Sequence, residues 1–160
     1  MSLGRNKYTI HKVGEYAQLA GTTYYGGQPC AINTSGTLEK AISDGSTTYV
    51  GIFANYSAVD AKTKDVKSTF YAGTCVLTLM KATPNVDNRT TNVEGTAGVD
   101  GDDYPYNTGL VYNEGDKLYV GADGLWTNVN PGSKQALGVV LYAGTNSLTV
   151  LFNNLAGAVI

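Results

Sequence analysis

The histidine content limits the catalytic chemistry open to this chain. A hydrolase that works through a nucleophile needs a base within hydrogen-bond reach, and histidine most often supplies that base. The one histidine, His11, lies in the same short stretch as Lys7 and Lys12 near the amino terminus. This setting is typical of an exposed side chain. The sequence therefore predicts no enzyme of the nucleophile–base type.

Clustered carboxylates offer a second kind of chemistry. Asp100, Asp102 and Asp103 are close enough in sequence to suit a glycosidase pair, or a calcium ion that prefers oxygen ligands. The surrounding sequence is polar and provides no apolar wall to raise a carboxyl pKa, and it lacks the twelve-residue spacing and terminal Glu of a calcium loop. We expect solvated loop charges here, with calcium binding as the alternative.

The two cysteines, Cys30 and Cys75, complete the inventory of reactive groups. Together with one histidine they cannot supply the four ligands of a structural zinc site. Both lie in apolar, strand-like sequence, so we predict buried free thiols, with a disulfide as the alternative. The Gly-rich stretches lead into strands rather than helices, which excludes phosphate-binding and dinucleotide motifs. We expect no enzyme, no cofactor and no metal.

Composition indicates the elements that carry these residues. The 160 residues include 20 Gly and 12 Tyr, and only 15% are charged, against roughly 25% in an average soluble domain. Such a chain favours strands and turns. The net charge is −2 and the basic residues are scattered, so we expect no nucleic-acid partner. Neither a membrane-spanning apolar run nor the apolar core of a signal peptide is found, so we expect no membrane and no export.

The order of patterns along the chain predicts an extended arm followed by one β domain. Residues 1–15 form the arm, whose strand-like part, residues 7–13, is suited to pairing with a sheet edge of this subunit or another. Residues 16–160 form the domain, with a long polar loop over residues 83–108. Helical turns are expected only around residues 13–19 and 59–67. Strands are expected over residues 29–33, 37–42, 47–54, 68–82, 109–112, 117–120, 125–126, 136–143 and 147–153.

A weak repeat links the two ends of this domain. Aligning residues 28–38 with 116–126 places Leu38 on Trp126, and residues 50–54 align with 137–141. The match is either a structural duplication or a chance product of abundant Gly and β-branched residues. In both cases the glycines inside strands, Gly51 and Gly138, indicate bends, which favour a small curved barrel over a flat sandwich.

Tyrosine supplies large, rigid contact area and a hydroxyl group, and is enriched at protein interfaces. Four tyrosines lie in turn or loop sequence and are expected to be exposed: Tyr24, Tyr25, Tyr104 and Tyr106. The others lie in strand-like sequence, where tyrosine is a common strand residue.

Five segments together resemble the capsid decoration, or cement, proteins of tailed bacteriophages. These segments are Gly27–Ile32, Tyr49–Ala54, Gly115–Val120, Ala136–Leu141 and Leu148–Phe152. The resemblance covers roughly residues 14–153 with a gap at the middle loop, which is longer than expected for the family. The shared motifs are structural rather than catalytic.

The resemblance implies a small β-barrel or β-tulip fold and a homo-oligomer, with a trimer favoured. The protein would be made in the host cytoplasm and bind the outer surface of the virion capsid. It would bridge subunits of the major capsid protein and stabilise the expanded head, with its arm augmenting a capsid strand. The expected contact residues are Arg5, Tyr8, Ile10 and Val13 of the arm and Tyr24, Tyr25, Tyr104 and Tyr106. The alternative is a phage fibre, spike or other glycan-binding β domain, which would expose Trp126 or a tyrosine pair; a cement protein would bury Trp126.

Overall fold

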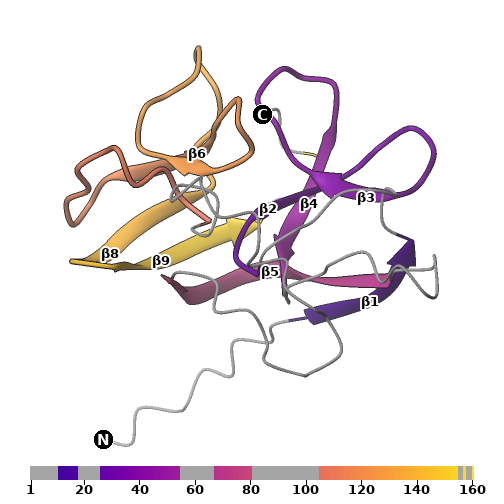
Figure 1. Ribbon diagram of the computed structural model, residues 1–160, viewed down its shortest axis with the longest axis horizontal. Coiled ribbons are helices and arrows are strands. Elements are labelled where there is room, and N and C mark those ends of the chain that lie inside the picture. Colours follow the sequence, from indigo (N-terminus) through magenta and orange to yellow (C-terminus); the bar gives the residue numbers. More distant parts are fainter. Residues whose placement is uncertain (1–10, 18–25, 55–66, 81–104, 155–156, 158–159) are drawn as a thin grey trace, which may run out of the picture.

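The computed structural model describes residues 11–17, 26–54, 67–80, 105–154, 157 and 160. All regular elements in these ranges are strands (Figure 1). They are β1 (His11–Ala17), β2 (Pro29–Ile32), β3 (Leu38–Lys40), β4 (Thr48–Phe53), β5 (Lys67–Met80), β6 (Lys117–Val120), β7 (Trp126–Thr127), β8 (Gly138–Gly144) and β9 (Ser147–Asn154). The prediction of an all-β chain is confirmed. The described ranges contain no helix that could cross a membrane.

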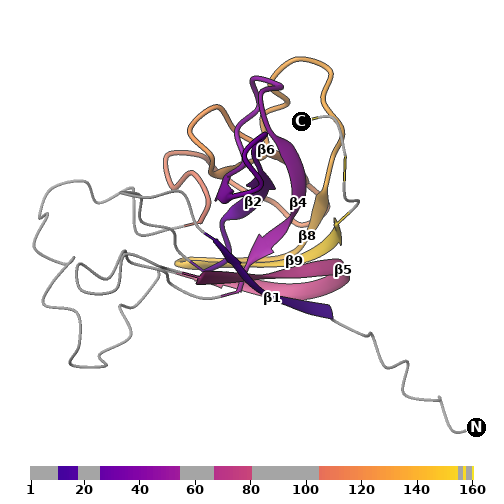
Figure 2. The same cartoon turned by 90° about the vertical axis from the view of Figure 1, so that its right-hand side faces the viewer.

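The strands form one curled antiparallel sheet. Its order is β3-β2-β4-β5-β9-β8-β6-β7, and β1 pairs with β5 outside this path. Seen from the side, β5, β9 and β1 make a base over which the other strands rise and curl (Figure 2). The expected strong curvature is confirmed, in the form of a half-barrel.

Two units of four strands account for this order. The first unit comprises β2 to β5 and the second comprises β6 to β9. In each unit the second strand lies outermost, followed by the first, the third and the fourth. The two fourth strands, β5 and β9, pair along eight residues and join the units. The sheet is therefore two copies of one pattern placed end to end.

The pairing register reproduces the sequence repeat residue by residue. Cys30 faces Gly51 in the first unit, and Leu118 faces Gly138 in the second. The hairpins agree as well, since Ile32 faces Leu38 where Val120 faces Trp126. The repeat that the sequence left open is therefore structural.

The backbone hydrogen bonds at the start of each unit are equivalent as well. Gly27 N donates to Phe53 O at 2.8 Å, and Gly115 N donates to Val140 O at 2.8 Å. Phe53 N donates back to Gln28 O at 2.9 Å, as Val140 N does to Asp116 O at 2.9 Å. The backbone thus enters both units through the same bonded turn.

The two strand glycines are needed where the sheet bends. A Cβ on Gly51 would collide with the carbonyl oxygen of Tyr71, and one on Gly138 would lie 2.8 Å from Val150 Cγ1. A register shift at Cys30–Ala31 adds to the bend beside Gly51. Glycine here allows a close approach of neighbouring strands.

The main core is shared by the two units, and Trp126 lies in it with 0% of its surface exposed. The ring of Trp126 packs edge-on against Tyr49 of the first unit, with 6.2 Å between the ring centroids. It also packs against Phe152 of the second unit, with 4.8 Å between the centroids. Its indole nitrogen donates to the backbone oxygen of Gly27 at 2.7 Å. This bond ties the second unit to the start of the first, and it satisfies the one polar atom of a buried ring.

Both cysteines are buried and free, as predicted. Cys75 belongs to the main core, and Cys30 belongs to a smaller cluster with Leu38, Phe53 and Phe70. Burial raises the pKa of the Cys30 thiol well above its ordinary value. The Cys30 thiol is thus held in the unreactive, protonated form.

Two local expectations are wrong. Residues 109–112, expected as a strand, are irregular: they follow a turn at residues 108–109, in which Gly109 N donates to Asn107 Oδ1 at 2.9 Å. This side-chain bond to the backbone competes with strand pairing. Residues 13–17, considered for a helical turn, lie in β1.

The carboxyl-terminal end of the expected arm pairs with the sheet of the same chain, one of the two pairings that the sequence allowed. β1 pairs with β5 of the same chain, with Val13 opposite Phe70. Residues 11–15 of the expected arm therefore belong to this chain's own sheet. Residues 1–10, and most of the expected middle loop, lie outside the described ranges.

Candidate binding surface and pocket

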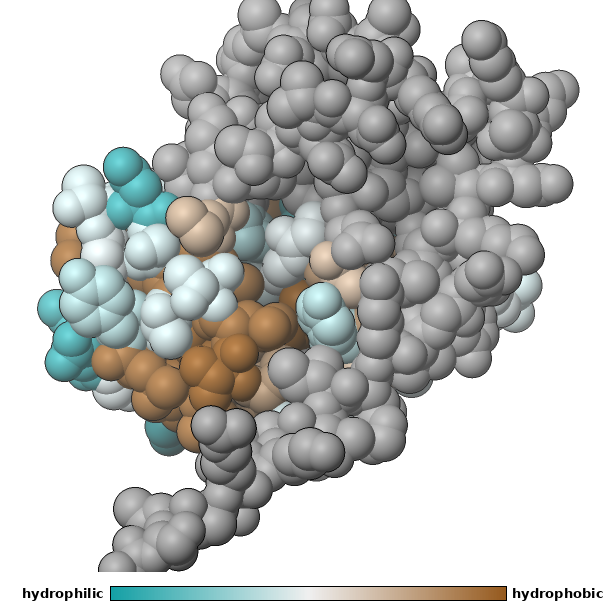
Figure 3. All heavy atoms as spheres, turned by 90° about the horizontal axis from the view of Figure 1, so that it is seen from below, coloured by the Kyte–Doolittle hydropathy of each residue, from teal (hydrophilic) through white to brown (hydrophobic). Residues whose placement is uncertain are grey.

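The outer face of β5, β9 and β8 exposes a group of large apolar side chains. This bare face consists of Val76, Met80, Val139, Leu141, Tyr142 and Leu151, each between 37% and 59% exposed. The register places Val76 opposite Leu151, and Leu151 opposite Val139. They therefore form a continuous apolar row across three strands. Figure 3 shows apolar residues gathered on this side of the molecule.

The parts of these strands that carry the bare face contain no charged residue. Residues 73–80 and 138–154 contain no Lys, Arg, Asp or Glu. The polar groups beside the row pair across the strands, because Thr78 and Thr149 share a hydrogen bond at 3.1 Å and Thr74 donates to Asn153 at 3.3 Å. An apolar, uncharged area of this kind on a protein surface marks an interaction site.

The corresponding position of the first unit, Ile52, belongs to the main core that the two units share. Ile52 occupies in β4 the place that Val139 occupies in β8, and it is 0% exposed where Val139 is 37% exposed. The repeat places the same kind of side chain at both positions. Only the second unit leaves it open in the isolated chain.

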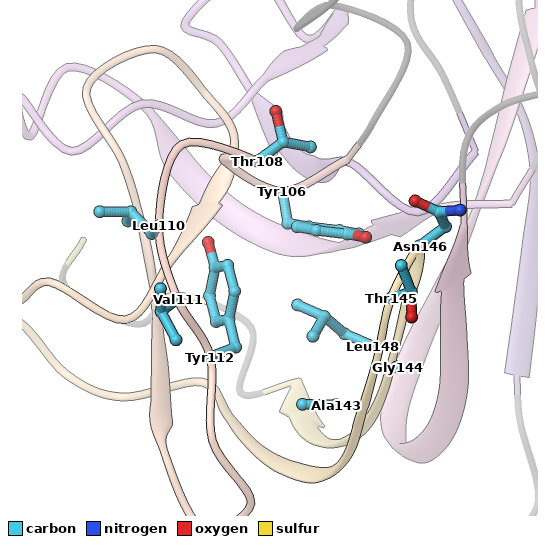
Figure 4. A pocket seen from close by; sticks show the side chains of 10 residues that line it. All are labelled: Tyr106, Thr108, Leu110, Val111, Tyr112, Ala143, Gly144, Thr145, Asn146 and Leu148. Carbon is cyan, nitrogen blue, oxygen red and sulfur yellow. The ribbon is translucent and has the colours of Figure 1, made fainter.

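A cavity of about 390 Å³ opens at the end of the bare face, between the turn of β8 and β9 and the segment leading to β6 (Figure 4). Its lining residues are uncharged: Tyr106, Thr108, Leu110, Val111, Tyr112, Ala143, Gly144, Thr145, Asn146 and Leu148. We call this cavity the hairpin pocket.

Tyr106 and Tyr112 set the shape of the hairpin pocket. Their rings meet edge-on at 5.6 Å. The Tyr112 hydroxyl lies 3.0 Å from Asn107 O and 3.2 Å from Trp126 O, and donates its proton to these carbonyls. Burial raises the pKa of Tyr112, so the hydroxyl stays neutral. It acts as a structural donor rather than as an acid or base.

The expectation that Tyr106 is exposed is wrong. Its side chain is 5% exposed and belongs to the main core. Its backbone forms an isolated parallel β-bridge with Trp126. The polar sequence around it suggests a surface position, but this long-range pairing brings the ring inside.

The other expected contact residues are not brought together by the described structure. Val13 lies in β1. Arg5, Tyr8, Ile10, Tyr24, Tyr25 and Tyr104 lie outside the described residues.

Sequence reasoning missed the bare face, although a signal for it exists. The run Cys75–Met80 is apolar apart from Thr78, and Val139, Val140 and Leu141 of β8 are apolar in succession rather than alternating with polar residues. Strands of this composition are typical of sheets covered on both sides. Only one side of these strands is covered here, and Val76, Leu151 and Val139 stay exposed on the other.

The described residues hold no group of three His, Cys, Asp or Glu side chains suited to a metal ion. Asp100, Asp102 and Asp103 lie outside them. Comparison of the chain with protein-family models, with curated proteins and with solved structures found no match.

Proposed function

We propose that the chain is a structural virion protein that binds the outer surface of a phage capsid. In this proposal it bridges subunits of the major capsid protein and stabilises the expanded head. The observation that carries the proposal is the bare face, an apolar area on an otherwise well-packed domain. Its chemistry suits another protein surface.

The absence of charge on the bare face supports a protein partner in particular. A nucleic-acid surface would require Lys or Arg to neutralise phosphates, and β5 from residue 73 onward, β8 and β9 have none. Buried Trp126 supports the same reading, because its ring has no face open for stacking on a sugar. This burial is the outcome expected of a cement protein.

Stabilisation by binding follows from linkage. A protein that binds only the expanded lattice lowers the free energy of that state by an amount that grows with concentration and affinity. Bridging needs at least two contacts per decorating unit. The bare face is one of them, and residues 1–10 of the arm or a neighbouring copy in a homo-oligomer, with a trimer favoured, supply another.

Sedimentation with capsids tests this function. The wild-type chain is mixed with expanded capsids and with procapsids of the phage that encodes it, and bound protein is measured in the pellet. We expect saturable binding to expanded capsids and little to procapsids, because the contacts are properties of the expanded lattice. Equal binding to both forms, or to neither, contradicts the proposal.

The arm is tested by a deletion that respects the sheet. Removing residues 1–10 leaves β1 and its pairing with β5 intact. We expect a folded protein with reduced occupancy on expanded capsids. Unchanged occupancy would assign attachment to the bare face without the arm.

A further inference from the structure

The two units of the sheet meet at two places that differ in strength. At the middle of the sheet, β5 and β9 pair along eight residues. The end strands, β3 and β7, do not pair with each other within the described residues. Near these ends, Ser43 N, which follows β3, donates to Gly121 O, which follows β6, at 3.3 Å. We call this weaker junction of the two units the seam.

Trp126 lies at the seam, because it begins the end strand β7. Its ring packs against Tyr49 of the first unit, and its indole N–H donates to Gly27 O at the start of that unit. Separating the units at the seam would break both contacts. The chain has a single tryptophan, so this indole N–H is a specific reporter of the seam.

Gly157 and Ile160, the described residues beyond β9, bridge the two units. Gly157 N donates to Tyr49 O of the first unit at 2.8 Å. Lys134, between β7 and β8 of the second unit, donates from Nζ to Ile160 O at 2.7 Å. The Ile160 side chain is 2% exposed and belongs to the main core. The end of the chain marked C lies among the loops of both units, away from β5 and β1 (Figures 1 and 2). We call Gly157 and Ile160 the clasp.

The loop before β8 holds Lys134 in place for this contact. Asn130 Oδ1 accepts a bond from Lys134 N at 2.9 Å, and Asn130 Nδ2 donates to Lys134 O at 3.2 Å. Ser133, next to Lys134, has a φ of 58°, a conformation that residues other than glycine rarely adopt. Such a backbone persists where the surrounding contacts determine it. The position of Lys134 is therefore fixed by its own loop before it meets Ile160.

We propose that the clasp holds the seam closed, and that the seam opens when Lys134 releases Ile160 while β5 and β9 stay paired. A bond from a lysine ammonium is charge-assisted and is stronger than a bond between neutral groups. Proteins open locally where few backbone bonds hold a region, and the seam is such a region beside the eight paired residues of β5 and β9. This inference does not depend on the proposed function, because no residue of the bare face belongs to the clasp or the seam.

Hydrogen exchange of the full chain, followed by NMR, tests the clasp. The probes are the Gly157 N–H, the Trp126 indole N–H and the backbone amides of β5 and β9. Lys134→Met removes the bond to Ile160 O, and Lys117→Met, at an exposed position of β6 in the same unit, is the charge-matched control. Asn130→Ala is a second variant, which keeps the lysine and removes the two bonds that fix its loop.

In the wild-type protein we expect Gly157 and the Trp126 indole to be equally protected, with protection factors at least about tenfold below those of the slowest amides of β5 and β9. Lys134→Met should lower both protection factors by about tenfold, the effect of losing roughly one hydrogen bond to a charged group. Asn130→Ala should lower both by less, and Lys117→Met should leave both unchanged.

Three results would overturn the clasp. Protection of Gly157 and the Trp126 indole as high as that of β5 and β9 would mean that the seam has no opening of its own. Unchanged protection in Lys134→Met would show that the lysine does not hold the seam. Loss of protection at Gly157 alone would mean that the residues beyond β9 fray while the seam stays closed.

Discussion

The two units of the sheet share one backbone plan and differ in what covers them. Strand order, register and entry hydrogen bonds agree between β2–β5 and β6–β9. In the first unit β4 and β5 are joined by residues 54–66, whereas β8 and β9 are joined by the two-residue turn Thr145–Asn146. Ile52 is covered and its counterpart Val139 is open. The repeat thus determines the sheet, and Ile52 packs in the main core whereas Val139 is left on the bare face.

The largest expected effect comes from placing a charge at the two equivalent positions. Ile52→Lys should destabilise the protein by about 3–5 kcal/mol, because it buries an unpaired charge. Val139→Lys should change the free energy of unfolding by no more than about 0.5 kcal/mol, because the site is open to solvent. Urea denaturation of both variants measures the contrast. Equal losses would mean that the bare face is covered within the isolated chain.

The next test replaces Trp126 with the residue type found at its counterpart in the first unit. Trp126→Leu gives the second unit the residue that the first has at Leu38. We expect a loss of about 2–4 kcal/mol, because the change leaves a cavity against Tyr49 and Phe152 and removes the bond to Gly27 O. Thermal unfolding followed by circular dichroism checks this. A loss below about 1 kcal/mol would show that the indole does not tie the units together.

The strand glycines give a smaller contrast. Gly51→Ala meets a backbone oxygen, which cannot move without shifting a strand, and should cost about 2–3 kcal/mol. Gly138→Ala meets side chains of Val150 and Phe152, which can adjust, and should cost about 1–2 kcal/mol. Denaturant midpoints of the two variants rank them. The reverse order would contradict the bend assigned to Gly51.

Asp116 gives the smallest effect, and it depends on pH. Hydrogen bonds from Asn113 N and Asn128 Nδ2, both 2.9 Å, lower the pKa of this carboxyl below its ordinary value. The stabilisation is therefore present above the ordinary Asp pKa of about 3.9 and is lost as the pH falls through the lowered folded-state value. Its counterpart in the first unit, Gln28, does not titrate.

We expect Asp116→Asn to be less stable than wild type at about pH 7 and to approach it at about pH 2, because the wild-type carboxylate is protonated as the pH falls through its lowered pKa. Chemical denaturation at the two pH values measures the difference. The same difference at both values would mean that the carboxylate charge has no part in these bonds.

Much of the sheet could be predicted from the sequence, because short β-branched runs and glycine turns act locally. Residues 109–112 were missed because Leu110, Val111 and Tyr112 have strand composition, while the turn is held by hydrogen bonds from Gly109 N and Leu110 N to Asn107. Burial of Tyr106 depends on Trp126, twenty residues away. The bare face escaped because an apolar strand reads the same whether its second face meets the core, a partner or water.

The central claim is that the bare face binds the capsid. The most direct test measures how much Leu151→Lys protein binds to expanded capsids, with Ala122→Lys as the charge-matched control. Leu151 lies at the middle of the bare face, between Val76 and Val139, whereas Ala122 lies at an exposed turn between β6 and β7. We predict that Leu151→Lys remains folded and loses attachment, while Ala122→Lys attaches as wild type does. Full attachment of folded Leu151→Lys would contradict the assignment of this face to capsid binding.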